Sequence, residues 1–131
     1  MKSKSTGSKI KVLLLITGSI AAVRIPLLVS QLAKENYEIK CVLSTNAEKL
    51  IKPLSLSILS RNPCVLENDQ WSNKQSTPLH IELGNWADIL IIAPLTATSL
   101  AKWVTGNAEG LIPSILIANT KPIIVAPAMN T

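Results

Sequence analysis

Short runs of consecutive apolar residues place the strongest constraint on how this chain can fold. They are KVLLLIT at 11–17, DILIIAP at 88–94, and IIVAP within the segment 121–130. An unbroken apolar run of this length is typical of a strand covered on both faces, as in a parallel sheet. We therefore expect strands at 11–17, 88–94 and 121–130, and a further strand, EIKCVLST, at 38–45.

Helical spacing of apolar residues separates these strands. Residues 19–36 carry apolar side chains at helical intervals, and Pro26 predicts a bend within a single helix. NAEKLI predicts the start of a second helix, which Pro53 interrupts. The other expected helices are 54–60, 95–106 and 111–119. HIEL at 80–83 is ambiguous, and the polar, turn-rich residues 61–78 predict an exposed loop.

This alternation of strands and helices predicts an α/β fold: a doubly wound parallel sheet in a three-layer α/β/α arrangement. The 131 residues suit one domain, spanning 10–131, after a Ser- and Lys-rich leader at 1–9 that we expect to be disordered. Apolar residues make up 47% of the chain and charged residues 16%, which is typical of a globular protein.

Charge and cysteine content narrow the classes of partner. The net charge is +5, but the basic residues are scattered without aromatic residues between them, so we expect no nucleic-acid partner. No apolar run reaches the roughly 18 residues of a membrane span, so we expect no membrane partner either. Cys41 and Cys64 lack metal-ligand spacing, which favours reduced thiols in a cytoplasmic protein without a metal site.

Small and hydroxyl residues follow the predicted strands, where ligands bind in open α/β sheets. TGSIAA follows the first strand, STNA the second, and LTATS the strand at 88–94. The resulting candidates are Gly18, Ser19, Ser44, Thr45, Asn46, Thr96, Thr98 and Ser99. Each segment can also be read as an ordinary capped helix start, but together they favour a phosphate-bearing ligand. The glycines of a dinucleotide fingerprint are absent, so a mononucleotide is the better fit.

His80, the only histidine, has two interpretations. An unperturbed imidazole titrates near neutral pH and can act as a general base. A lone histidine on a loop before a strand is also an ordinary structural residue. Asp88 is expected to be structural, and Trp86 and Trp103 are expected to pack on helices or at an interface.

Three segments taken together, TGSIAA, HIELGNWADILIIAPLTATSLAK and APAMNT, resemble the flavoprotein family of FMN-dependent cysteine decarboxylases. The resemblance covers residues 10–131 and is strongest to the phosphopantothenoylcysteine decarboxylase branch. It implies a Rossmann-like FMN-binding fold that forms homotrimers, or dodecamers built from trimers, with active sites between subunits. It also implies a carboxy-lyase of coenzyme A biosynthesis that oxidatively decarboxylates 4'-phospho-N-pantothenoylcysteine to 4'-phosphopantetheine.

The resemblance also assigns roles to individual residues. His80 matches the histidine of the oxidative step, and Asn130 matches the asparagine that holds the substrate carboxylate. The residues that match FMN contacts are Gly18, Ser19, Ile20, Ser44, Thr45, Asn46, Thr96, Ala97, Thr98, Ser99 and Ala128.

The chain departs from the family pattern in two places. Thr98 stands where many relatives have asparagine, and the chain stops at Thr131, before the family's substrate-clamping flap and its proton-donating cysteine. We expect either a fragment of a longer, bifunctional decarboxylase and ligase, or a shortened flavin-binding protein. A non-catalytic regulatory subunit and a flavin prenyltransferase-like enzyme are the alternative functions.

Overall fold

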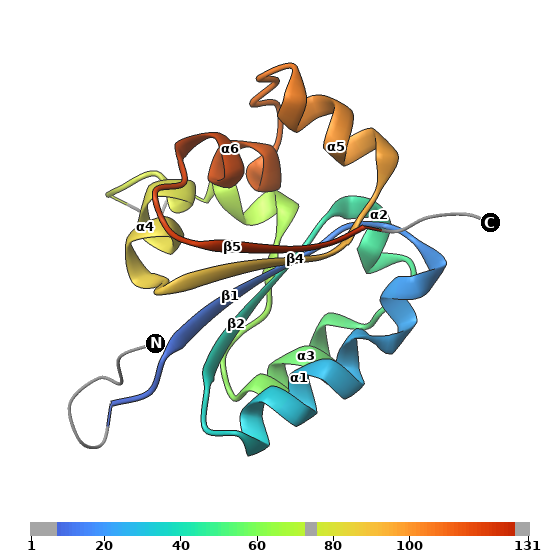
Figure 1. Ribbon diagram of the computed structural model, residues 1–131, viewed down its shortest axis with the longest axis vertical. Helices are drawn as coiled ribbons and strands as arrows, with labels where there is room; N and C mark the ends of the chain where they lie inside the picture. Colours follow the sequence, from blue (N-terminus) through green and yellow to red (C-terminus); the bar gives the residue numbers. More distant parts are fainter. Residues whose placement is uncertain (1–7, 73–75, 128–131) are drawn as a thin grey trace.

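The computed structural model describes residues 8–72 and 76–127, which form a parallel sheet with helices on both faces (Figure 1). The strands are β1 (Lys11–Ile16), β2 (Glu38–Leu43), β3 (Val65–Leu66), β4 (Ile89–Leu95) and β5 (Ile123–Pro127). They lie in the order β3-β2-β1-β4-β5, and every pair is parallel. The doubly wound three-layer fold and the four predicted strands are thus confirmed.

The central strand β1 explains why its sequence is an unbroken apolar run. Leu14 and Ile16 point into the core on one face of the sheet, whereas Leu13 and Leu15 point into the core on the other. All four side chains are fully buried. A strand sandwiched between two helical layers has no solvent face, so a polar residue at any of these positions would lose its hydration without compensation.

Each face of the sheet is covered by its own helices (Figure 1). The helical elements are η1 (Ile20–Arg24), α1 (Ile25–Lys34), α2 (Thr45–Glu48), α3 (Pro53–Ser60), η2 (Glu67–Trp71), α4 (Leu79–Trp86), α5 (Ala97–Val104) and α6 (Leu111–Ala118). Helices α1 and α3 pack together on one face, and α4 and α6 pack together on the other. None of these helices is long and apolar enough to span a bilayer, as far as the described ranges extend.

The predicted single bent helix at 19–36 is wrong in detail. The structure has a 3₁₀ helix, η1, followed directly by the α-helix α1, and Pro26 lies in the first turn of α1. Proline fits the first turn because that turn's N–H groups have no partner within the helix. Pro26 therefore marks the start of a helix instead of bending one.

Two other segments differ from the sequence prediction. The expected loop at 61–78 contains the two-residue edge strand β3 and the 3₁₀ helix η2. HIEL, which was ambiguous, lies in the first turns of α4, so His80 is helical and not in a loop. Both segments are too short for a repeating apolar pattern to reveal them.

Asp88 has the structural role expected of it. Its Oδ2 accepts a hydrogen bond from the Lys11 N–H at 2.8 Å, and its own N–H donates to the Lys11 carbonyl at 2.8 Å. Trp86 packs against the core as predicted, and the Lys40 ammonium lies 4.6 Å from its ring centroid. These contacts fix the amino ends of β1 and β4 relative to each other.

Candidate functional site

The winding of the chain reverses between β1 and β4. From β1 the chain runs to η1 and α1 on one face, whereas from β4 it runs to α5 and α6, of which α6 packs on the other face. The loops that leave the two neighbouring strands therefore diverge and leave a crevice at the carboxyl end of the sheet. This is where sequence reasoning placed a ligand.

Thr17 ties the two diverging loops together at the bottom of this crevice. Its side chain is buried, and its Oγ1 donates a hydrogen bond to the Pro94 carbonyl. The same oxygen accepts a hydrogen bond from the Thr96 N–H at 3.1 Å. Sequence reasoning missed Thr17 because it was read as the last residue of a strand. A hydroxyl at the end of an unbroken apolar run was the available signal.

Gly18 is required by the close approach of two loops. A Cβ at this position would lie 2.4 Å from Asn46 Cβ and 3.0 Å from the Asn46 carbonyl carbon. Distances this short are incompatible with any side chain unless the backbone moves. Gly18 thus allows the segment after β1 to contact the segment after β2.

The predicted hydroxyl residues begin helices, as expected. Ser19 Oγ accepts from the Ala21 N–H, Ser44 Oγ from the Ala47 N–H, and Thr96 Oγ1 from the Ser99 N–H, each at 3.2 Å. Thr96 Oγ1 also donates to Ser99 Oγ at 3.0 Å. Capping accounts for one hydroxyl in each segment. It leaves Thr45 and Thr98 exposed at the rim without a capping role.

A cavity of about 390 Å³ lies between these loops. The structure brings seven of the predicted residues together in its lining: Gly18, Ser44, Thr45, Asn46, Thr96, Thr98 and Ser99. Ser19, Ile20 and Ala97 do not line it. Ile20 is 72% exposed, so its side chain faces away from the cavity. The predicted set is thus largely assembled by the fold.

The cavity also has charged lining residues that sequence reasoning did not identify. They are Glu67 from η2, Lys102 from α5 and Glu109 from the loop before α6. Glu67 Oε2 accepts hydrogen bonds from the Leu111 N–H, at the start of α6, and from Gln70 Nε2 at 3.0 Å. A carboxylate at a helix N-terminus is stabilised by the free N–H groups there.

Gly110 makes the contact between Glu67 and α6 possible. Its φ is +105°, and it precedes α6 without contributing a side-chain cap. A Cβ here would lie 3.2 Å from Glu67 Oε2. The absent cap was the signal in the sequence, because a buried helix start without a capping side chain needs an acceptor from elsewhere.

His80 does not line this cavity within one copy of the chain. It lies in the first turn of α4 and lines a small hollow of about 40 Å³. The lining of this hollow also includes Ile115 of α6 and Asn119, which follows α6. Asn130 and Ala128 lie outside the described residues. The interpretation that joins His80 to the rim therefore depends on contacts that a single copy does not make.

Neither cysteine is placed to react at the rim. Cys41 lies in β2, fully buried, and Cys64 precedes β3, half-buried. Burial raises the pKa of the Cys41 thiol far above its usual range, and burial together with the carboxylates of Asp69 and Glu48 raises the pKa of Cys64 to about 12. Both are protonated, unreactive thiols at neutral pH. The described residues contain no cluster of His, Cys, Asp and Glu that could hold a metal ion.

Known proteins resemble this chain over most or all of its length. The chain is 39% identical to phosphopantothenoylcysteine decarboxylase of Arabidopsis thaliana over 136 aligned positions, which cover 100% of this chain and 64% of that protein. It is 37% identical to the coenzyme A biosynthesis bifunctional protein CoaBC of Escherichia coli (strain K12), covering 92% of this chain and 29% of that protein.

Solved structures give the same relationship. A structure described as PPC decarboxylase mutant C175S complexed with pantothenoylaminoethenethiol superimposes with a TM-score of 0.81 at 37% identity, covering 95% of this chain and 69% of that one. The chain spans less than two thirds of the length of the two curated relatives above. The model of the Flavoprotein family matches residues 1–131, and the chain therefore belongs to the Flavoprotein family.

Proposed function

We propose that the rim cavity binds FMN. The observation that carries this proposal is the lining itself, in which seven residues from the ends of three strands converge on about 390 Å³. This volume lies within the range of small-molecule sites, roughly 300–1,000 Å³. Exposed hydroxyls and helix starts suit a phosphate, and Lys102 adds a cation at the same rim. Relatives described as FMN-dependent or FMN-binding share the fold.

The residues present fit such a cofactor in two respects. Thr45 and Thr98 are exposed at the rim and are not used as helix caps, so their hydroxyls are free to bind a phosphate or ribityl group. Gly18 lines the cavity, and its missing side chain lets the loop after β1 lie against Asn46, which lines the cavity too. The buried hydrogen bonds of Thr17 hold the two loops at a fixed separation beneath the ligand.

The proposed reaction is the oxidative decarboxylation of 4'-phospho-N-pantothenoylcysteine to 4'-phosphopantetheine in coenzyme A biosynthesis. The relatives named above support this substrate, because one is described as phosphopantothenoylcysteine decarboxylase and the other as a coenzyme A biosynthesis protein. Bound FMN would supply the two-electron chemistry. His80 would take the proton from the cysteinyl end of the substrate, and Asn130 would hold the carboxylate that leaves as carbon dioxide.

The position of His80 requires a site made by more than one copy of the chain. The small hollow that His80 lines and the rim cavity share no lining residue. An imidazole must lie within hydrogen-bond reach of the proton it removes, so one chain alone does not assemble the proposed site. We therefore include self-association, as a homotrimer, in the proposal, with His80 reaching the cavity of a neighbouring copy.

An exposed apolar stripe supports this self-association. Ile20, Val23 and Leu27 follow one another at helical spacing along η1 and α1 and are 72%, 50% and 75% exposed. Contiguous exposed apolar residues of this kind mark interaction surfaces. We expect Leu27→Asp to shift the sedimentation coefficient toward that of a monomer, whereas Lys49→Asp, at an exposed position elsewhere, leaves it unchanged. Equal sedimentation of both variants would exclude this surface.

Flavin binding is tested first, by the visible absorbance of the purified full-length protein and by identification of the released cofactor. FMN in the wild type, and its loss in Thr98→Val with the fold intact by circular dichroism, is the expected result. A colourless protein that does not take up added FMN would refute the cofactor assignment.

Catalysis is tested separately, with the FMN-loaded protein. Carbon dioxide release from 4'-phospho-N-pantothenoylcysteine is expected to fall by about 10²-fold or more in His80→Asn, the range for loss of a general base. Asn85→Gln, on the same helix, is the matched control and should retain activity. An FMN-loaded wild type that releases no carbon dioxide would instead favour the non-catalytic flavin-binding subunit.

A further inference from the structure

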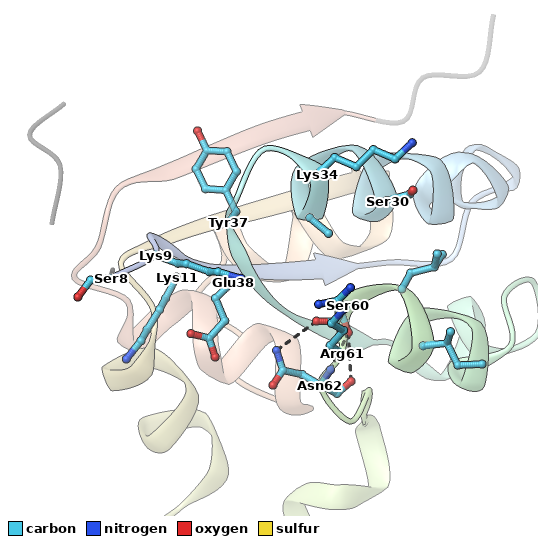
Figure 2. Close-up of a pocket in the computed structure, with 13 residues that line it drawn as sticks. Ser8, Lys9, Lys11, Ser30, Lys34, Tyr37, Glu38, Ser60, Arg61 and Asn62 are labelled. Atoms are coloured by element: carbon cyan, nitrogen blue, oxygen red, sulfur yellow. Dashed lines mark hydrogen bonds between the residues drawn. The ribbon is translucent and has the colours of Figure 1, made fainter. Parts of the chain in front are cut away.

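A second hollow in the described part of the chain lies at the opposite end of the sheet from the rim cavity. Its volume is about 800 Å³, and it lies between the carboxyl ends of α1 and α3, at the start of β1 and β2 (Figure 2). Ser30 and Lys34 reach it from α1, Ser60 and Arg61 from the end of α3, and Lys9 from the segment before β1. The proposed flavin chemistry does not use this region.

The hollow carries more positive than negative side-chain charge. Lys9, Lys34 and Arg61 are exposed, and the described residues offer no hydrogen bond or ion pair to any of these three side chains. Lys11 adds a fourth cation to the lining, and its ammonium also lies 5.9 Å from the centroid of the Trp86 ring. Glu38 is the only carboxylate in the lining.

Two of these cations have a possible structural explanation. Lys34 lies in the last turn of α1 and Arg61 is the C-cap of α3, and a helix C-terminus carries about half a negative charge. Two helix ends and Glu38 together offset about two of the four positive charges. About two positive charges remain, and Lys9, which follows no helix, supplies one of them. Neutralising the helix ends therefore does not account for all the cations.

One wall of the hollow is apolar. Ile58, which is 67% exposed, contributes to the lining, as do Ala33, Leu59 and Tyr37. Two polar side chains of the lining, Asn62 and Ser60, already form hydrogen bonds within the chain. Asn62 Nδ2 donates to the Ile39 carbonyl at 2.7 Å, and Ser60 Oγ donates to the Asn62 carbonyl at 3.1 Å. The lining thus combines cations that have no partner among the described residues with exposed apolar surface.

We propose that this hollow binds a small phosphate monoester with an aromatic or aliphatic body. The phosphate would lie among Lys9, Lys34 and Arg61, and the body would lie against Ile58 and the Tyr37 ring. Phosphate is favoured over a singly charged anion because exposed charge pairs are individually weak, so only a dianion gains enough from three of them. The apolar wall favours a ligand with a body over inorganic phosphate alone. This site is independent of the proposed flavin site.

Calorimetric titration of the full-length protein with adenosine monophosphate tests the proposal, with adenosine and inorganic phosphate as partial probes. Adenosine monophosphate should bind below about 1 mM, and each partial probe at least about tenfold more weakly. The double variant Lys9→Gln/Arg61→Gln should weaken binding about five- to tenfold, since each exposed charge contact is worth up to about fivefold.

The matched control is Lys49→Gln/Lys52→Gln, which removes the same charge at exposed positions outside the hollow. It should bind like the wild type. Equal affinity in the two double variants, equal binding of adenosine and its monophosphate, or no binding up to about 10 mM would each overturn the proposal. Circular dichroism checks that both variants fold, and the visible flavin absorbance, read on the same samples, shows separately whether the cofactor assignment holds.

Discussion

Helices α5 and α6 follow each other in the chain, have eight residues each, and differ sharply in how they are held (Figure 1). Four residues of α6 are buried: Leu111, Ile112, Ile115 and Leu116. No residue of α5 is buried. Yet both helices begin at the rim cavity, α5 after Thr96 and α6 after Gly110. The cavity thus has one wall anchored in the core by buried residues and one wall, α5, whose contact with the core is the partly buried Trp103.

This difference separates stability from ligand binding. Burial of α6 contributes directly to the free energy of unfolding, because its apolar side chains leave water when the chain folds. The conformation of α5 depends on the Thr96 cap and on the partly buried Trp103. Elements with few buried contacts open most easily, and ligand-binding segments are commonly of this kind.

The largest effect is expected in α6. Ile115 is 1% exposed, and Ile115→Ala should lower the free energy of unfolding by about 2–5 kcal/mol, through lost burial and the cavity left behind. Urea denaturation followed by circular dichroism measures this at fixed protein concentration. A loss below about 0.5 kcal/mol would mean that α6 is not an anchored wall.

A smaller effect is expected at the contact that orients α6. Glu67→Gln removes the charge but keeps a neutral acceptor for the Leu111 N–H, and it should cost about 0.5–2 kcal/mol, the range for a partly buried charge at a helix N-terminus. Glu109→Gln, exposed in the neighbouring loop, is the matched control and should be close to neutral. Urea denaturation of both variants makes the comparison. Equal stability would show that Glu67 lines the cavity without supporting the helix.

The same contrast explains how much of the molecule the sequence could predict. The unbroken apolar runs predicted four strands because a strand covered on both faces has to be apolar throughout. They could not reveal β3, since Val65–Leu66 is two residues long and its pairing with β2 depends on the whole sheet. Predicting the helices was likewise easier than deciding which of them the core would cover.

The candidate site was predictable to a similar extent. Hydroxyl residues after strands indicated the rim, because parallel strands bring their carboxyl ends to one edge. Glu67 was not predictable, since a single acid in a polar segment has no periodicity, and its contact with Leu111 spans 44 positions of the chain. His80 was a candidate because it is the only histidine, and the resemblance assigned its role. That it reaches the rim of a neighbouring copy is our proposal. Its role stays a prediction.

The cap of α5 should matter more for the ligand than for the fold. Thr96→Val keeps the shape of the side chain but removes the acceptor of the Ser99 N–H, a loss of about 0.5–2 kcal/mol for helix α5 itself. Since no residue of α5 is fully buried, we expect global stability to fall by less than about 1 kcal/mol while FMN affinity falls several-fold. Fluorescence titration with FMN measures the affinity.

The matched control for Thr96→Val is Thr105→Val at the other end of α5. Thr105 Oγ1 donates to the Ala101 carbonyl at 2.8 Å and does not line the rim cavity. This variant should leave FMN affinity unchanged. Equal loss of affinity in both variants would mean that α5 acts as a whole and that its cap has no special role.

The smallest effect is expected for Val104→Ala, the counterpart of Ile115→Ala on the other helix. Val104 is 77% exposed, so truncating it removes little buried surface and leaves no cavity, and the free energy of unfolding should change by less than about 0.5 kcal/mol. Urea denaturation at two protein concentrations makes the test informative about assembly. A loss of 1 kcal/mol or more that grows with protein concentration would show that a second copy covers α5, because only an intermolecular contact depends on concentration. A large loss of unfolding free energy that does not depend on protein concentration would instead show that Val104 is covered within a single chain, which would contradict its exposure in the structure.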